Sequence, residues 1–234
     1  MLAAALRKLE VPFLVAVPLA LGLCAYFQFD QTALLTLGVV MVAMGVFFAS
    51  YEASRPALRQ IMPTVVLGAL AAAGRMLFAP FPSFKPVSAI CIVAGVVFGR
   101  RSGFMVGALA ALVSNFFFGQ GPWTPWQMYA WGLVGYGAGV LADRGAFDRK
   151  PVVYGYGFCS AMLYGFLLNS WYLVGFVHPI TWPAAVATYA AGFPLDCVHG
   201  VATVVFLLAI FIPWRRKLER IRRKYNLVAD GSRP

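Results

Sequence analysis

Two polar residues in the last long apolar run of the chain could act as one unit. Asp196 and His199 are three residues apart in the stretch GFPLDCVHGVATVVF, so a helix would place both on one face. There the carboxylate can hold one tautomer of the imidazole while both groups hydrogen-bond a ligand. The same pair can instead link two helices inside the protein. A metal site is not expected, because two ligands are too few.

The rest of the chain lacks the clustered groups that a membrane enzyme needs. Its 8 Asp and Glu residues are scattered, and the sequence has no HExxH or Walker A motif. The 4 cysteines lie in or beside apolar runs without a CxxC pair, which is typical of small buried hydrophobes. We therefore expect a protein that is not an enzyme, that has no resident cofactor, and that depends on a partner for any ATP-driven work.

Long apolar blocks indicate the class of protein. The chain is 61% hydrophobic and 12% charged, whereas about a quarter of the residues in soluble domains are charged. In lipid, only a helix can satisfy its own backbone hydrogen bonds over such a block. The sequence predicts an all-α polytopic membrane protein with eight helices, at about 11–28, 32–50, 61–78, 87–99, 102–118, 127–142, 152–174 and 184–213.

Positive charge orients these helices. The net charge of +11 does not indicate nucleic acid, because the basic residues lie beside apolar runs and are densest after Pro213. With a cytoplasmic N-terminus, every Lys and Arg except Arg75 and Lys85 falls on the inner side. We expect a multi-pass protein of the cell membrane with both termini in the cytoplasm. Its basic tail, residues 214–234, is expected to be a solvated helix, with contact to anionic lipid as the alternative.

Three predicted outer connections differ from the inner ones. The stretches 79–88, 119–128 and 175–184 carry proline and aromatic residues but little charge, while the inner connections are short and basic. The middle stretch reads GQGPWTPWQM. Three rigid aromatic loops on one side favour the wall of a pocket that takes a ligand from outside. The alternative is an aromatic belt, since Trp and Tyr favour the membrane interface generally.

The third predicted helix carries small residues on two adjacent rows. Gly68 and Ala72 form one pair four residues apart, and Ala69 and Ala73 form the other. Lipid does not drive helices together, so small residues allow the close backbone approach that holds them. These rows serve either packing inside the bundle or a face for a separate membrane partner. Arg75 follows near the outer end, where it extends outward to solvent or points into the pocket.

An ordered set of motifs resembles the membrane-embedded S component of energy-coupling factor (ECF) vitamin transporters. ALAAAGRMLF resembles the first core helix of that family, with its AxxxA motif at Ala69 and Ala73. Three later stretches resemble the segments that follow in that family: FPSFKPVSAICIVAGVVFGRRSGFMVGALAALVSN, FFFGQGPWTPWQMYAWGLVGYGAGVLA and GFPLDCVHGVATVVF. The resemblance covers about residues 61–213, a six-helix core. Residues 1–60 would add two transmembrane helices ahead of this core, which departs from the family's usual form.

The resemblance implies a function and a set of partners. An S component binds its vitamin from outside, in a pocket that its outer loops close, and topples in the membrane to release it. It works with a transmembrane coupling subunit and two cytoplasmic ATPases, as part of an ABC-type importer. The alanine motif would face the coupling subunit. The candidate partner-binding residues are Gly68, Ala69, Ala72 and Ala73.

The loop GQGPWTPWQM indicates a substrate. It resembles most the loops of S components assigned to cobalamin, and an aromatic mouth suits a large, flat corrinoid. Riboflavin, pantothenate or another vitamin is the alternative, because aromatic stacking does not separate a corrin from a flavin. The candidate substrate-binding residues are Arg75, Lys85, Asn115, Phe117, Gln120, Trp123, Trp126, His178, Trp182, Asp196 and His199.

Other functions stay open on the sequence alone. A stand-alone secondary carrier usually needs a charge at mid-membrane, and the sequence has no evident relay of such charges. A membrane enzyme acting through Asp196 and His199, and a scaffold that uses the basic tail, are further hypotheses. The first two helices could shield the core, bind another partner, or change how the core moves.

Overall fold

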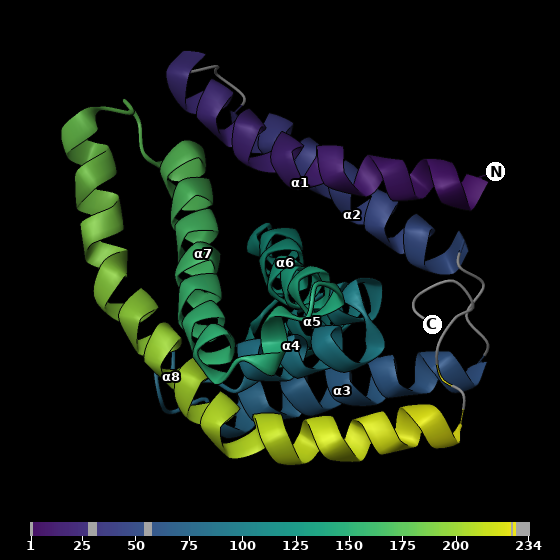
Figure 1. Ribbon diagram of the computed structural model, residues 1–234. Coiled ribbons are helices and arrows are strands. Elements are labelled where there is room, and N and C mark those ends of the chain that lie inside the picture. Colours follow the sequence, from purple (N-terminus) through teal and green to yellow (C-terminus); the bar gives the residue numbers. More distant parts are fainter. Residues whose placement is uncertain (1, 28–31, 54–57, 226, 228–234) are drawn as a thin grey trace.

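The computed structural model describes residues 2–27, 32–53, 58–225 and 227, and within these residues every regular element is a helix (Figure 1). Six of the helices are long and apolar enough to cross a membrane. The prediction of an all-α polytopic membrane protein is therefore confirmed. The elements are α1 (Leu2–Phe27), α2 (Thr32–Ala53), α3 (Leu58–Leu77), α4 (Val87–Phe98), α5 (Arg100–Phe118), α6 (Trp123–Asp143), the short 3-10 turn η1 (Ala146–Asp148), α7 (Lys150–Phe176) and α8 (Trp182–Lys224).

The helix α8 differs most from its expected bounds. Residue 213 was its predicted end, yet the helix continues to Lys224 with Pro213 inside it. A proline removes one backbone hydrogen bond and bends a helix, and neighbouring contacts can hold the helix on both sides of the bend. In Figure 1, α8 first runs beside α7 and then changes direction for its last part. The basic segment expected after residue 213 therefore begins inside a helix.

The short helix α4 lies at the centre of the bundle. Every residue from Val87 to Val97 is buried. It packs against α5, α6 and α8, and less closely against α3 and α7. A helix that is apolar all round belongs inside a protein. Because its neighbours shield it from lipid, α4 can be shorter than the roughly 20 residues that a lipid-facing span needs.

Glycines bring α4, α5 and α6 into close contact. A Cβ atom added to Gly95 would lie 2.0 Å from the carbonyl oxygen of Gly135. One added to Gly107 would lie 2.3 Å from the carbonyl carbon of Trp131. Only a residue without a side chain allows this backbone approach, which is the way helices pack where lipid gives no driving force. The contacts fix the helices that carry the candidate site.

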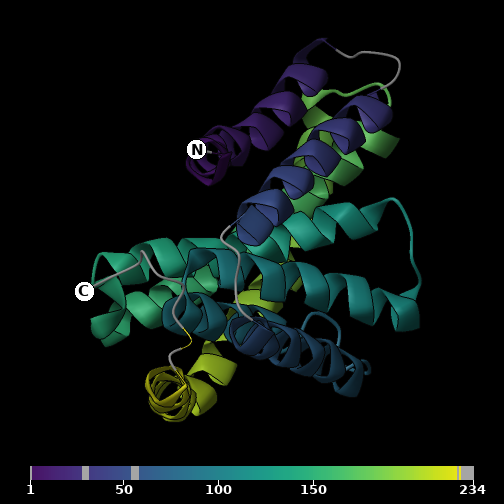
Figure 2. The same ribbon diagram turned by 90° about the vertical axis from the view of Figure 1, so that its right-hand side faces the viewer.

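The first two helices form a hairpin that packs on the α6 and α7 side of the core (Figures 1 and 2). The carboxylate of Glu10 in α1 is buried at this junction. It accepts hydrogen bonds from the Tyr136 hydroxyl at 2.8 Å and from the Arg101 Nε at 2.7 Å, and a third from the Ser50 hydroxyl. The Thr32 hydroxyl of α2 donates to the backbone oxygen of Val174 at 2.9 Å. Polar contacts thus attach this hairpin to the core.

Candidate functional site

Arg75 lies in the last turn of α3 and reaches inward. Its Nη1 donates to the Ser114 Oγ at 2.7 Å and to the Asn115 Oδ1 at 2.6 Å. The guanidinium carbon lies 4.5 Å from the centre of the Phe118 ring and 5.0 Å from the centre of the Trp131 ring, within the range of cation–π attraction. No carboxylate in the described part of the chain forms an ion pair with Arg75. Its charge is therefore available to an anionic or carbonyl group of a ligand.

Asn115 joins this arginine to the start of α6. Its Nδ2 donates to the Thr124 Oγ1 at 3.0 Å and to the Gln127 Oε1 at 2.8 Å. The Thr124 hydroxyl donates to the Gln120 Oε1 at 2.9 Å, and the Gln120 amide donates to the backbone oxygen of Leu112 at 2.9 Å. Gln120, in the connection between α5 and α6, thus bonds to both flanking helices. The loop is held as a fixed surface around Asn115.

A chain of aromatic rings extends the cluster toward α8. The Trp131 and Tyr164 rings are stacked, with centroids 4.6 Å apart, and Tyr164 meets the His199 ring edge-on at 5.0 Å. The His199 Nε2 is hydrogen-bonded to the Ser88 Oγ at 2.8 Å. The indole nitrogen of Trp131 is buried and has no hydrogen-bond partner among the described residues. A buried donor of this kind usually binds something, so it is a candidate ligand contact.

Asp196 and His199 have different partners although they share a helix. The Asp196 Oδ2 accepts a hydrogen bond from the Asn169 amide of α7 at 2.9 Å. A Cβ atom added to Gly165 of α7 would lie 2.0 Å from the Asp196 Oδ1, so the carboxylate packs closely on that helix. His199 instead bonds to Ser88 of α4. The pair links α8 to two neighbouring helices, and His199 alone is joined to the Arg75 cluster through the aromatic rings.

Lys85 stabilises the loop in which it lies. Its ammonium group donates to the backbone oxygens of Phe78, Ala79 and Phe81, the last at 2.8 Å. Partial burial and repulsion from Arg75 lower the pKa of Lys85. The bonds to three carbonyls hold the loop between α3 and α4 in shape.

The tryptophans expected near the ligand lie in different surroundings. Trp126 is fully buried at 0% exposure, and its indole nitrogen has no partner among the described residues. Trp123 is 37% exposed, and its ring lies over Gly121, where a Cβ atom would come within 2.4 Å of it. Trp182 is 86% exposed and lies with Tyr189 along an apolar surface of α8. Only Trp123 combines an open ring face with the fixed loop beside Asn115.

Two further candidate residues lie on the surface. Phe117 is 64% exposed, and its ring meets that of Phe118 edge-on at 5.1 Å. His178 is exposed in the connection between α7 and α8. Figure 2 shows this connection and the one between α5 and α6 on the same right-hand side of the molecule, well apart. His178 thus belongs to a different connection from the one that follows Asn115.

The two rows of small residues on α3 face opposite surroundings. Gly68 and Ala72 are buried, and a Cβ atom on Gly68 would lie 3.0 Å from the Cβ of Leu109 in α5. Ala69 and Ala73 are exposed. One row therefore packs inside the bundle, and the other is open to a partner.

Several residues of the cluster were missed on the sequence. A signal was present, because polar side chains inside apolar helices are costly and tend to have partners or functions. Ser114, directly before Asn115 in an apolar run, is such a case. The missed residues are Ser88, Ser114, Thr124, Gln127, Trp131, Tyr164 and Asn169.

A family model matches most of the chain. The model of a family described as "ECF-type riboflavin transporter, S component" matches residues 56–215. The matched range begins just before α3 and ends beside Pro213 in α8. No solved structure matches the chain.

Proposed function

The chain belongs to the family of ECF-type transporter S components, and on this premise we propose that it captures a vitamin from outside the cell in the cluster around Arg75. The observation that carries the proposal is a cation held by Ser114 and Asn115 between two aromatic rings, with no carboxylate among the described residues to neutralise it. The buried and unsatisfied indole nitrogen of Trp131 adds a second group that a ligand would satisfy. Transport inward would use the ATP-driven ECF module.

Cobalamin is the substrate that we propose first. The loop GQGPWTPWQM supports it through its resemblance to cobalamin-type S components. The exposed rings of Phe117 and Trp123 offer flat apolar area, and the Arg75 guanidinium offers a donor for amide or phosphate oxygens. A corrinoid carries amide and phosphate oxygens around one large, flat ring system.

Riboflavin is the second candidate, because the matching family is described by that vitamin. The exposed ring of Trp123 also suits the planar ring of a flavin, and Arg75 could donate to its carbonyl oxygens. The two candidates differ in size, so they would contact the exposed rings of Phe117 and Trp123 to different extents.

The proposal includes an orientation. The ends of α3 and α5 that carry Arg75 and Asn115 would face outward, and both termini would lie in the cytoplasm. The distribution of Lys and Arg supports this topology. The exposed row of Ala69 and Ala73 would face the coupling subunit.

A titration panel tests the proposal. The purified protein in detergent would be titrated with cobalamin, riboflavin and pantothenate by calorimetry, without ATP. We expect saturable one-to-one binding of cobalamin. Binding of riboflavin alone would overturn cobalamin as the proposed substrate, but the protein would still be a vitamin-binding S component. If none of the three binds while the protein is folded, capture of these vitamins at the Arg75 cluster is wrong.

A further inference from the structure

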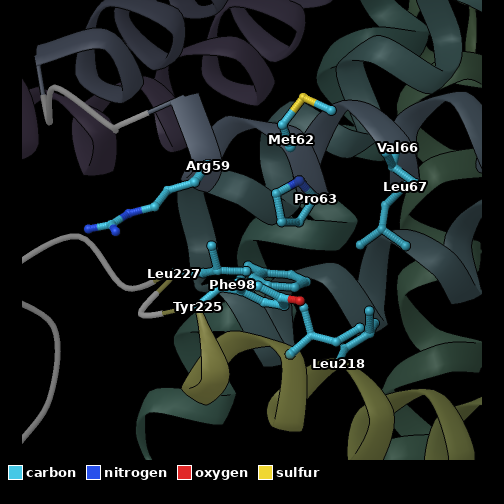
Figure 3. Close-up of a pocket in the computed structure, with 10 residues that line it drawn as sticks. Arg59, Met62, Pro63, Val66, Leu67, Phe98, Leu218, Tyr225 and Leu227 are labelled. Atoms are coloured by element: carbon cyan, nitrogen blue, oxygen red, sulfur yellow. The ribbon is translucent and has the colours of Figure 1, made fainter.

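An apolar groove lies between α3 and the last part of α8 (Figure 3). It has a volume of about 400 Å³. Arg59 marks one edge of the groove, on α3. The residues that line it are otherwise almost all apolar, and they include Met62, Val66, Phe98, Leu218, Ile221 and Tyr225.

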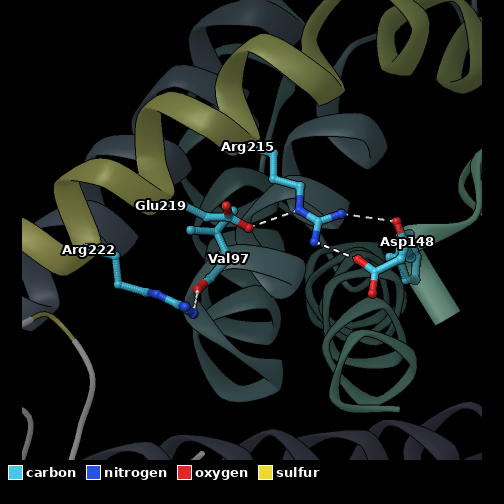
Figure 4. Close-up of polar contacts among 6 residues, drawn as sticks. Val97, Asp148, Arg215, Glu219 and Arg222 are labelled. Carbon is cyan, nitrogen blue, oxygen red and sulfur yellow. Dashed lines mark hydrogen bonds and ion pairs between the residues drawn. The ribbon is translucent and has the colours of Figure 1, made fainter. Parts of the chain in front are cut away.

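One wall of this groove is the last part of α8, and two arginines hold it in place (Figure 4). We call residues 214–225, which include the end of α8, the terminal arm. Arg215 forms ion pairs with Asp148 at 2.8 Å and Glu219 at 2.9 Å, and it donates to the backbone oxygen of Phe147 at 3.1 Å. Arg222 donates to the backbone oxygen of Val97 at 2.7 Å. The terminal arm is therefore anchored to η1 and α4, and the groove beside it is a built feature.

The terminal arm is amphipathic. At 3.6 residues per turn, Leu218, Ile221 and Tyr225 form one stripe, which faces the groove. The anchoring residues Arg215, Glu219 and Arg222 flank this stripe on one side. Its other flank carries the exposed residues Lys217, Arg220 and Lys224.

The terminal arm runs alongside α3 and across α5 and α6. Figure 2 shows the terminal arm end-on, while α5 and α6 run across the view, so the terminal arm lies roughly perpendicular to α5 and α6. It lies at the left of that view, away from the connection between α5 and α6. Amphipathic helices with a basic polar face are attracted to anionic lipids.

We propose that the groove binds an anionic phospholipid of the bilayer. An acyl chain would fill the apolar space between α3 and the terminal arm, and the phosphate of the headgroup would be bound by Lys217 and Arg220. No acid among the described residues forms an ion pair with these cations. The open flank of an apolar groove thus carries unpaired positive charge, which is complementary to a lipid with an apolar tail and a negative head.

The test compares lipids and matched charge variants. Native mass spectrometry would count the lipids retained by the full-length protein from equal mixtures of phosphatidylglycerol and phosphatidylcholine with identical acyl chains. We expect preferential retention of phosphatidylglycerol. Lys217→Gln with Arg220→Gln should weaken it about tenfold or more, from roughly 1 kcal/mol for each basic residue near a membrane surface. Arg216→Gln with Arg223→Gln removes the same charge from the opposite face of the terminal arm and should leave retention unchanged.

A second variant tests the apolar part independently of charge. Val66→Trp would fill the groove and should also reduce retention of phosphatidylglycerol. Equal losses in both charge variants, or equal retention of the two lipids by the unmodified protein, would overturn the proposal. It would also be wrong if purified ECF module displaces the lipid and Val66→Trp prevents binding of that module, because the occupant would then be protein.

Discussion

The Arg101 Nε lies 2.7 Å from the Glu10 Oε1, so an ion pair joins α1 to the first turn of α5. The Glu10 side chain is 1% exposed and that of Arg101 is 17% exposed. A buried carboxylate is tolerated only when its oxygens are satisfied, and here Ser50 and Tyr136 complete its hydrogen bonds. The N-terminal hairpin is therefore attached as a part of the folded protein.

Replacement of Glu10 tests this attachment. Glu10→Ala leaves the Arg101 charge and the Tyr136 hydroxyl without their shared acceptor, and we expect a loss of about 3 kcal/mol or more of stability. Thermal unfolding in detergent measures the loss. Glu52→Ala removes an exposed acid from the same hairpin and is the control. Equal unfolding temperatures for the two variants would show that the junction is not stabilised by this pair.

Arg75 is expected to control vitamin affinity. Arg75→Gln keeps a hydrogen-bond donor but removes the charge, and we expect binding to weaken about tenfold to a hundredfold. Arg59→Gln, at the opposite end of α3, is the control and should bind the vitamin normally. Calorimetric titration measures both. Unchanged affinity in Arg75→Gln would show that Arg75 has only a structural role, through its bonds to Ser114 and Asn115.

The two rows of small residues should respond differently to added bulk. Ala73→Leu enlarges the exposed row, so we expect uptake with the ECF module to fall while vitamin binding persists. Gly68→Leu enlarges the buried row against Leu109, so the protein itself should be destabilised. Uptake in proteoliposomes and vitamin binding by the purified protein separate the two effects. Equal loss of vitamin binding in both variants would contradict a partner face at Ala73.

Replacement of Trp123 and of Trp126 by alanine should have different effects. Trp126→Ala empties a fully buried site, and a loss of about 3 to 5 kcal/mol of stability is expected. Trp123→Ala removes a partly exposed ring, so stability should change little while vitamin affinity falls. Thermal unfolding and titration of each variant make the comparison. A stable Trp123→Ala protein with normal affinity would exclude that ring as a ligand contact.

Much of the fold could be predicted because lipid imposes strong rules. Apolar blocks gave the helices and their order, and prolines and glycines marked the connections. The sequence predicts a solvated helix after Pro213, but neither its continuity with the preceding helix nor its attachment to the core could be predicted in this way. Pro213 is a typical stop signal, but Arg215 and Arg222 hold the following residues in a helix by contacts with distant segments.

The candidate site was predicted less completely, because its residues depend on pairings across the bundle. Arg75 could extend outward or inward on the sequence alone, and only its contacts with Ser114 and Asn115 decide between the two. Trp123 and Trp126 both lie in the first turn of α6 with similar local signals, yet the first is partly exposed and the second is fully buried. The partner of His199, Ser88, is 111 residues away and has no local signal.

The length of α4 sets the depth of the candidate site. Its 12 residues rise about 18 Å, whereas the hydrocarbon layer is about 30 Å thick. Ser88, which bonds to His199, lies in the first turn of α4. On the proposed function, the short central helix would form the floor of the site, and a vitamin bound above it would have crossed part of the apolar layer before any ATP is used.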